Sequence, residues 1–230
     1  MTARKLRREV WAAHLELVKQ GLVIHTWGNA SGIDRDLGVM IIKPSGVDYE
    51  TLQPEQMVVV SLDSGAVLEG KLRPSLDTPT HLELYRAFKQ IGGIVHTHSL
   101  AATAWAQARR DLPPLGTTHA DYFLGPVPCT RSLKPGEIKN DYEINTARAI
   151  IEAVRDPLTC PGVLVASHGP FAWGRTVTHA VHHAVVLEHL ARLATQTLRV
   201  FPSTKPLHRV LLEQHFFRKH GPGARYGQPC

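Results

Sequence analysis

Apolar residues recur at helical spacing in several segments of the chain and form short continuous runs in others. The segment Lys5–Gln20 carries them on one face and is followed by Gly21, which predicts an amphipathic helix with a glycine at its C-terminal cap. Asp77–Pro79 places an acidic cap and a proline at the first turn of a helix that reaches about Phe88. Strands are predicted at the apolar runs 39–42, 57–60, 66–68, 94–98 and 162–166, and further helices at 101–108, 143–154, 177–198 and 206–220.

The order of these elements determines the predicted class. Strands alternate with helices, so we expect an α/β fold around a central sheet. No internal repeat or long linker divides the sequence, which predicts one domain over residues 1–230, with a polar tail over 221–230 that carries Tyr226. No apolar run has the length of a membrane span, and no apolar segment follows the basic N-terminus. A cytoplasmic protein without a membrane partner is therefore expected.

Composition adds charge and histidine. The 26 basic and 20 acidic residues give a net charge of +6. The basic residues are scattered in twos and threes without a basic stripe, so a small anionic substrate explains the charge as well as nucleic acid does, and no nucleic-acid partner is predicted. Cys129, Cys160 and Cys230 have no C-x-x-C spacing, which argues against a disulfide framework or a thiolate zinc cluster. The chain has 14 histidines, and imidazole is the commonest metal ligand.

One group of residues has the spacing of a metal site. His96 and His98 stand at i and i+2 in a predicted strand, where side chains share a face. His168 follows another predicted strand at a Gly-Pro turn, and Asp77 stands at a helix entrance. Three imidazoles and a carboxylate suit Zn²⁺, with Mn²⁺ or Co²⁺ as substitutes. The alternative is that His96 and His98 are hydrogen-bonded core residues and Asp77 is only a helix cap.

A second group competes with the first. His179, His182 and His183 stand at i, i+3 and i+4 on the predicted helix 177–198. This helix has its own amphipathic pattern, and such histidines are more often surface or interface residues. The helical group is therefore less favoured as a metal site.

Seven segments follow one another along the chain in a recognisable order: Thr26–Ser31, Lys43–Tyr49, Asp77–His81, His96–Ser99, Gly116–Tyr122, Ser167–Gly174 and Tyr226–Gln228. In order and almost without implied insertion, they resemble the L-ribulose-5-phosphate 4-epimerase family of the class II aldolase/epimerase superfamily. The resemblance implies a mostly antiparallel sheet flanked by helices in three layers (α/β/α), and a homotetramer with active sites at subunit interfaces. It also implies zinc held by Asp77, His96, His98 and His168. Aldolases of the superfamily usually carry Glu at the position of Asp77, which favours the epimerase branch.

The reaction implied by the resemblance is inversion of C4 of L-ribulose 5-phosphate to D-xylulose 5-phosphate, a step of L-arabinose and of L-ascorbate breakdown. C4 is β to the carbonyl, so loss of its proton gives no enolate. Cleavage of C3–C4 is easier, because a divalent metal stabilises the enediolate that is left. The aldehyde re-adds through its opposite face, so each side needs a proton carrier, and the resemblance assigns Asp121 and Tyr226. From the residues alone, Asp121 is a loop cap and Tyr226 a tail aromatic.

The resemblance also assigns residues that bind the phosphate through hydroxyl, amide and backbone N–H donors, at Asn29, Ser45, Gly46 and Ser75. Gly28 and Leu76 adjoin these positions and are assigned to the same substrate site, and Lys43 adds positive charge either to the phosphate or to the enediolate. Leu76 departs from the family, which has a second serine there. A hydrogen bond to a charged group is worth about 1.5–3 kcal/mol, so its loss weakens binding roughly tenfold or more unless another donor replaces it. Thr117, Glu143 and His215 match further active-site positions of secondary weight.

Two other functions remain open. A class II aldolase would cleave a related ketose phosphate and release free aldehyde. A non-catalytic basic protein with a structural zinc would instead bind nucleic acid in a salt-sensitive way and turn over no pentulose phosphate.

Overall fold

A seven-stranded sheet forms the centre of the computed structural model, which describes residues 3–221 and 223–225. The strand order is β4-β3-β2-β1-β5-β7-β6, and every pair of neighbours is antiparallel. The strands are β1 (Asn29–Asp34), β2 (Val39–Ile42), β3 (Val58–Ser61), β4 (Val67–Glu69), β5 (Gly93–His96), β6 (Gly162–Leu164) and β7 (Pro170–Gly174). The expected antiparallel sheet is confirmed.

The longer helices lie close to their predicted bounds. They are α1 (Ala3–Lys19), α2 (Thr78–Ala87), α3 (Leu100–Ala108), α6 (Tyr142–Ala153), α7 (Val177–Val200) and α8 (Arg209–Phe217). Gly21 has φ +65°, the left-handed conformation expected after the end of α1. Three short helices were not predicted: η1 (Pro54–Gln56), α4 (Thr117–Ala120) and α5 (Pro135–Lys139). Among the described residues no helix has the length and apolar character needed to cross a membrane.

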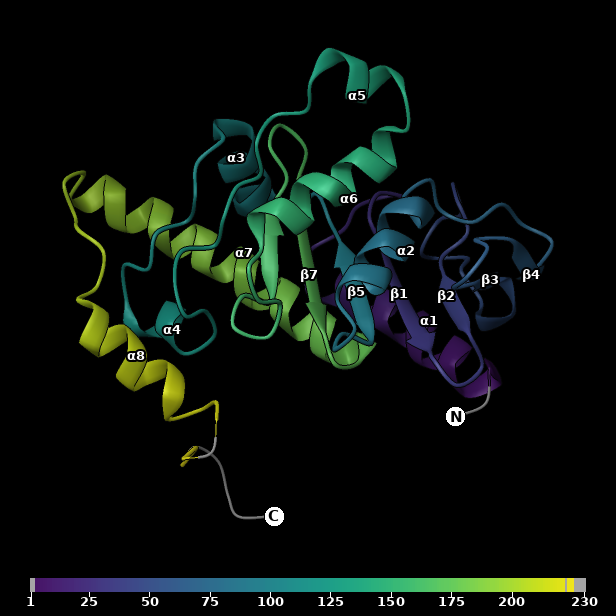
Figure 1. Ribbon diagram of the computed structural model, residues 1–230, viewed down its shortest axis with the longest axis horizontal. Coiled ribbons are helices and arrows are strands. Elements are labelled where there is room, and N and C mark those ends of the chain that lie inside the picture. The colour runs from purple at the N-terminus through teal and green to yellow at the C-terminus, as the bar shows by residue number, and fades with distance from the viewer. Residues whose placement is uncertain (1–2, 222, 226–230) are drawn as a thin grey trace.

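Helices cover both faces of the sheet and give three layers, as the resemblance implied (Figure 1). On one face α1 and α7 pack on Ile41 and Val95; on the other face α2 and α6 pack on Met40 and Ile94. Successive residues of one strand thus enter different cores, because strand side chains alternate between faces. Burial on both faces explains why β2 and β3 are continuous apolar runs although the sheet is antiparallel.

The sequence interpretation missed β1 and β7, although every residue of both strands is buried. β1 contains Asn29, Ser31 and Asp34, so it lacks an apolar pattern. The Ser31 hydroxyl is satisfied internally by His81 Nδ1 at 2.7 Å and by the Tyr85 hydroxyl at 2.8 Å. β7 begins with Pro170, and the Gly-Pro pair at this point predicts a turn and not the start of a strand. The predicted strand 94–98 is also corrected, because β5 ends at His96 and His98 lies beyond it.

Antiparallel pairing gathers four strand ends at one end of the sheet. Asn29, which begins β1, lies opposite His96, which ends β5, and His96 in turn lies opposite Phe171 near the start of β7. β2 ends at Ile42 on the other side of β1. The loops that follow β2 and β5 and those that precede β1 and β7 therefore converge at this end, and they carry the predicted site residues Gly28, Lys43, Ser45, Gly46, His98 and His168.

Candidate metal centre

The imidazoles of His96, His98 and His168 converge at this end of the sheet. One ring nitrogen from each lies within 4.8 Å of the others. His96 Nε2 and His98 Nε2 are 3.1 Å apart, and the ring centroid of His168 is 4.7 Å from that of His96 and 5.1 Å from that of His98. We call these three residues the triad. The structure thus brings together the three histidines that the sequence singled out.

A strained turn places His168. Ser167, the residue before it, has φ +62°, a left-handed conformation that is costly for a residue other than glycine. Its N–H donates to the carbonyl of Ala106 at 2.9 Å, and its hydroxyl accepts from Arg109 Nε at 3.2 Å. These contacts tie the turn between β6 and β7 to the end of α3, so the position of His168 is set by tertiary contacts.

The triad has the protonation that a metal site requires. His96 Nδ1–H donates to the carbonyl of Pro170 at 3.0 Å, which leaves Nε2 with its lone pair facing His98. Burial lowers the pKa of His96, against the opposing pull of Asp77. Burial also lowers the pKa values of His98 and His168. Near neutral pH the triad therefore offers neutral imidazoles, the form that binds a divalent cation.

Asp77 lies beside the triad but outside the group of three converging nitrogens. It precedes α2, yet its side chain makes no capping bond. Instead its Oδ2 accepts from Asn29 Nδ2 at 2.6 Å. Burial raises the pKa of this carboxyl, but His96, His81 and the Asn29 bond together lower it below its usual range. An ionised carboxylate thus faces the triad, a role that a helix cap alone does not explain. Its role as fourth ligand stays a prediction.

Two predicted phosphate-binding residues adjoin this carboxylate. The Ser75 hydroxyl accepts from Asn29 Nδ2 at 3.1 Å and from the N–H of Asp77 at 3.3 Å. Both contacts use the oxygen, so the hydroxyl proton can be donated to an anion. The Oδ1 atom of Asn29 is buried without a hydrogen-bond partner in the described part of the chain. Asn29 and Ser75 therefore connect the predicted phosphate-binding residues to Asp77 of the predicted metal site.

The loop after β2 and the loop before α2 pair with each other. We call residues 43–46 and 73–75 of these loops the paired cradle. Pro44 and Pro74 form an antiparallel bridge, and the N–H of Ser75 donates to the Lys43 carbonyl at 2.9 Å. Ser45 N–H donates to the carbonyl of Arg73 at 2.9 Å, so this N–H is used within the fold. Next to it, Gly46 keeps a left-handed φ of +69°.

Lys43 and Leu76 do not both present a side-chain donor to the predicted phosphate site. The Lys43 side chain is buried, with Nζ donating to the Val47 carbonyl and 4.9 Å from the centroid of the Tyr49 ring. Burial lowers its pKa to about 8, while Asp48 raises it. Leu76 is 74% exposed, so its side chain lies in solvent where the family has a hydroxyl. The phosphate roles of both residues stay predictions.

Gly28 fixes the approach of β1 to β5. It has φ +79°, and a Cβ atom here would lie 2.8 Å from the carbonyl oxygen of His96. The Tyr49 hydroxyl donates to the Gly28 carbonyl at 2.8 Å. A larger residue would push Asn29 away from His96.

Asp121 lies in a different part of the chain. Its carboxylate pairs with His215 Nδ1 at 3.2 Å, Arg218 at 3.1 Å and Lys219 at 3.0 Å. Burial raises its pKa, but hydrogen bonds from Lys219 and His215 lower it below its usual range. In Figure 1, α4 and α8 lie together at the lower left, away from α5 and the start of α6 at the top.

Within the described part of one chain, the predicted site residues therefore fall into two groups. Asp121 belongs with His215 and with Thr117, which begins α4. Glu143 lies at the start of α6, where its carbonyl accepts from Thr80 at 2.8 Å. Tyr226 lies outside the described residues. The proton-carrier roles of Asp121 and Tyr226 stay predictions.

Sequence reasoning missed two residues near the triad. The Tyr142 hydroxyl is 3.4 Å from His168 Nδ1; it stands at the start of α6 without a motif, so no signal in the sequence reveals it. His81 is fully buried and bonds Ser31. Its i, i+4 spacing from Asp77 puts both on one helix face, a signal that sequence reasoning could have used.

The histidines of α7 have other partners. His183 Nδ1–H donates to the Trp173 carbonyl at 2.6 Å, and His182 Nε2 is 3.2 Å from the Tyr122 hydroxyl. In the described ranges these histidines belong to no group of three converging ligand atoms.

Known proteins resemble the chain along nearly its whole length. A family model described as class II aldolase and adducin N-terminal domain matches residues 8–195. L-ribulose-5-phosphate 4-epimerase UlaF of Salmonella paratyphi B is 52% identical over 227 residues, which cover 98% of this chain and 99% of the relative. The protein of the same name from Salmonella typhi is also 52% identical over 227 residues, with the same coverage.

Solved structures with the same architecture include two aldolases. An L-fuculose 1-phosphate aldolase matches with a TM-score of 0.79 and 26% identity, over 93% of this chain and 97% of that one. The L-fuculose-1-phosphate aldolase of Thermus thermophilus matches with a TM-score of 0.68 and 25% identity, over 87% of this chain and 98% of that one.

Proposed function

Because the chain belongs to the family of class II aldolases and adducin N-terminal domains, we propose that it is a metal-dependent epimerase. The proposed reaction inverts C4 of L-ribulose 5-phosphate and gives D-xylulose 5-phosphate. One observation carries the proposal: three neutral imidazoles converge within 4.8 Å directly beside the group formed by Asn29, Ser75 and Asp77. A site for a divalent cation next to the paired cradle, which can bind a phosphate, fits a phosphorylated ketose.

The donor set of the triad fits zinc. His96, His98 and His168 would hold the ion through ring nitrogens, and Asp77, ionised and beside them, would complete the set. Mn²⁺ and Co²⁺ are substitutes with similar ligand preferences. Held there, a divalent cation would supply Lewis acidity toward the bound ketose.

The residues of the paired cradle would bind the phosphate. Ser75 has a hydroxyl proton to donate, Ser45 offers its hydroxyl, and Gly46 contributes a backbone N–H. Lys43 lies beneath this loop and adds positive charge. These donors keep the aldehyde fragment in the site while it turns, so that re-addition is favoured over escape.

Two groups would exchange protons with the C4 oxygen. When C3–C4 breaks, the C4 hydroxyl loses a proton to a base and the bonding electron pair stays with C3. When the bond re-forms on the other face, the new C4 oxygen takes a proton from an acid. Asp121 is ionised and suits the base; Tyr226 suits the opposite side.

We further propose a homotetramer in which each site lies between subunits. Asp121 is held by residues of α8 and the segment after it, apart from the triad of its own chain. A neighbouring subunit that presents this face would bring Asp121 to the triad of another copy.

A second candidate function is aldol cleavage with release of the aldehyde. The observation that favours it is the structural match to an L-fuculose 1-phosphate aldolase, with a TM-score of 0.79. The two functions differ in their product, since an epimerase retains the fragment that an aldolase releases.

The test is turnover of L-ribulose 5-phosphate by the protein with metal, after chelation and after metal is restored. We expect D-xylulose 5-phosphate with metal, none after chelation, and recovery with Zn²⁺. Free glycolaldehyde phosphate as the main product would establish the aldolase instead. Activity that survives full chelation would refute the metal-dependent proposal.

Leu76→Ser tests the phosphate cradle. An added hydroxyl next to Ser75 restores a donor to the phosphate, worth about 1.5–3 kcal/mol. We expect KM for L-ribulose 5-phosphate to fall roughly tenfold, with no change for unphosphorylated L-ribulose. Leu72→Ser, at another exposed leucine, is the matched control and is expected to change neither value. An equal KM in Leu76→Ser and the unmodified protein would place the phosphate elsewhere.

A further inference from the structure

One ring nitrogen of His168, Nδ1, lies beside a tyrosine hydroxyl. The hydroxyl of Tyr142 lies 3.4 Å from His168 Nδ1, and the two ring centroids are 6.2 Å apart. With Nδ1 engaged, Nε2 is the atom left for the triad. The two ring nitrogens of His96 are arranged in the same way: Nδ1–H donates to the Pro170 carbonyl, and Nε2 faces the triad. The two histidines therefore have comparable outer partners, a main-chain carbonyl for one and a phenol for the other.

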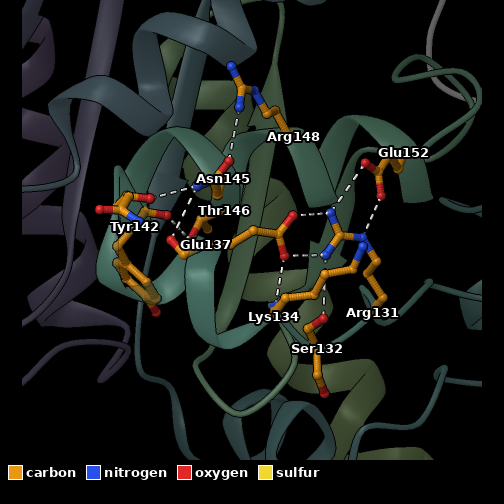
Figure 2. Close-up of polar contacts among 10 residues, drawn as sticks. Arg131, Ser132, Lys134, Glu137, Tyr142, Asn145, Thr146, Arg148 and Glu152 are labelled. Carbon is orange, nitrogen blue, oxygen red and sulfur yellow. Dashed lines mark hydrogen bonds and ion pairs between the residues drawn. The ribbon is translucent and has the colours of Figure 1, made fainter.

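The helix that carries Tyr142 is held by an ion-pair cluster, which Figure 2 shows. Arg131 bonds Glu137 of α5 through Nη1 at 2.8 Å and Nη2 at 2.9 Å, and bonds Glu152 near the end of α6 through Nε at 2.7 Å. Glu137 also accepts from the N–H of Lys134 at 2.7 Å. One guanidinium thus joins α5 to the far end of α6.

The corner between α5 and α6 is fixed by buried contacts. Asn145 Nδ2 donates to the carbonyl of Asn140 at 2.8 Å and to that of Glu137 at 3.2 Å. Asp141, at the corner, has φ +54°, a left-handed conformation. The Thr146 hydroxyl donates to the Tyr142 carbonyl at 2.8 Å. The left-handed conformation of Asp141 persists only where surrounding contacts hold it. Here the contacts of Asn145 and Thr146 hold it, and Tyr142, the first residue of α6, lies beside His168.

We propose that Tyr142 is a positioning residue of the metal centre, whose hydroxyl accepts the Nδ1–H of His168 and keeps His168 Nε2 directed at the triad. The cluster of Arg131, Glu137 and Glu152 supports it by holding the α5–α6 corner. This inference rests on the metal site of the proposed function. It does not depend on which sugar phosphate the enzyme converts.

Tyr142→Phe separates the hydroxyl from the ring. The phenyl ring retains the packing, while the hydrogen bond to His168 is lost. Outer partners of metal-bound histidines typically change metal affinity 10- to 100-fold. We expect the dissociation constant for Co²⁺ to rise roughly tenfold or more, and the visible absorption of bound Co²⁺ to change because the His168 ring is no longer fixed. The urea midpoint of the metal-free protein should not move.

Tyr122→Phe is the matched control. Tyr122 contacts His182 at 3.2 Å, so the substitution removes a tyrosine hydroxyl from a histidine elsewhere in the molecule. It should leave the Co²⁺ dissociation constant and spectrum unchanged. Arg131→Lys loses the forked contacts to the two glutamates and should weaken Co²⁺ binding in the same direction by a smaller factor. In the Tyr142→Phe background it should add little, because it acts through Tyr142.

Unchanged Co²⁺ affinity and spectrum in Tyr142→Phe would overturn the inference, as would an equal loss in Tyr122→Phe. Epimerase activity is measured on the same preparations. If the unmodified protein binds Co²⁺ and Tyr142→Phe weakens that binding, the inference stands even where no epimerisation is found. Normal epimerisation with no response to Tyr142→Phe would instead overturn the inference and leave the proposed function intact.

Discussion

Two histidine clusters, each of three residues, have the same side-chain chemistry in different surroundings. His96 ends β5, His98 follows in the next loop, and His168 lies in the turn before β7; their nitrogens converge within 4.8 Å. His179, His182 and His183 share one helix. Their closer spacing in sequence does not bring nitrogens together, since His183 is bound to the Trp173 carbonyl and His182 contacts Tyr122.

Burial does not distinguish the two clusters. It lowers the pKa of His183 to about 4, and it lowers the pKa values of the triad as well. Both clusters thus contain neutral imidazoles. The difference is the direction of the free nitrogen: in the triad the lone pair of His96 faces another imidazole, whereas in α7 the ring nitrogens face a carbonyl and a hydroxyl. In α7, His183 is bound to the main chain of β7, whereas His96 Nε2 of the triad faces another ring nitrogen.

The largest expected effect comes from removing a triad nitrogen. His96→Ala should abolish metal retention and lower epimerisation at least about a thousandfold, which corresponds to about 4 kcal/mol of transition-state stabilisation. Metal content per subunit after gel filtration and the rate of D-xylulose 5-phosphate formation measure both effects.

His182→Ala is the control in the other cluster and should retain its metal. His98→Ala provides a second triad variant, at an exposed position where truncation leaves no buried cavity. Metal loss in His182→Ala together with retention in His96→Ala would reverse the comparison.

His183→Leu is expected to have a smaller effect, and on the stability of the metal-free protein instead of on metal binding. The substitution leaves the Trp173 carbonyl without its donor, and an unsatisfied buried acceptor costs about 1–3 kcal/mol. The free energy of unfolding of the metal-free protein in urea should fall by that amount, with metal affinity unchanged. His98→Ala should do the reverse, weakening metal binding while changing metal-free stability by less than about 0.5 kcal/mol. Weaker metal binding in His183→Leu would mean that the clusters are not separate.

How far the sequence predicts this molecule depends on whether the signal is local. The i, i+2 spacing of His96 and His98 and the turn at His168 are local patterns, and the structure brings the three rings together. β1 gave no such pattern, because the polar groups of Asn29 and Ser31 bond partners that are distant in sequence. The same holds for Tyr142, which meets His168 only through tertiary contacts. The place of Asp121 beside α8 likewise follows from packing between distant segments.

The smallest expected effect concerns pH and uses His183 alone. Burial lowers its pKa from 6.5 to about 4 in the folded protein, with the Trp173 bond raising it and His182, His179 and His220 lowering it further. Between these pH values the unfolded chain binds a proton that the folded chain does not. Stability therefore falls as the pH drops through this window.

His183→Asn keeps a donor for the Trp173 carbonyl but cannot take up the proton. The loss of metal-free stability between pH 7 and pH 4.5 should be smaller in this variant than in the unmodified protein by about 2 kcal/mol, measured by urea unfolding across that range. His179→Asn, at an exposed position of α7, controls for the loss of a histidine from the same helix. Identical pH profiles for His183→Asn and the unmodified protein would show that His183 is protonated to the same extent in the folded and unfolded states, and the stabilising role of His183 would then rest on hydrogen bonding alone.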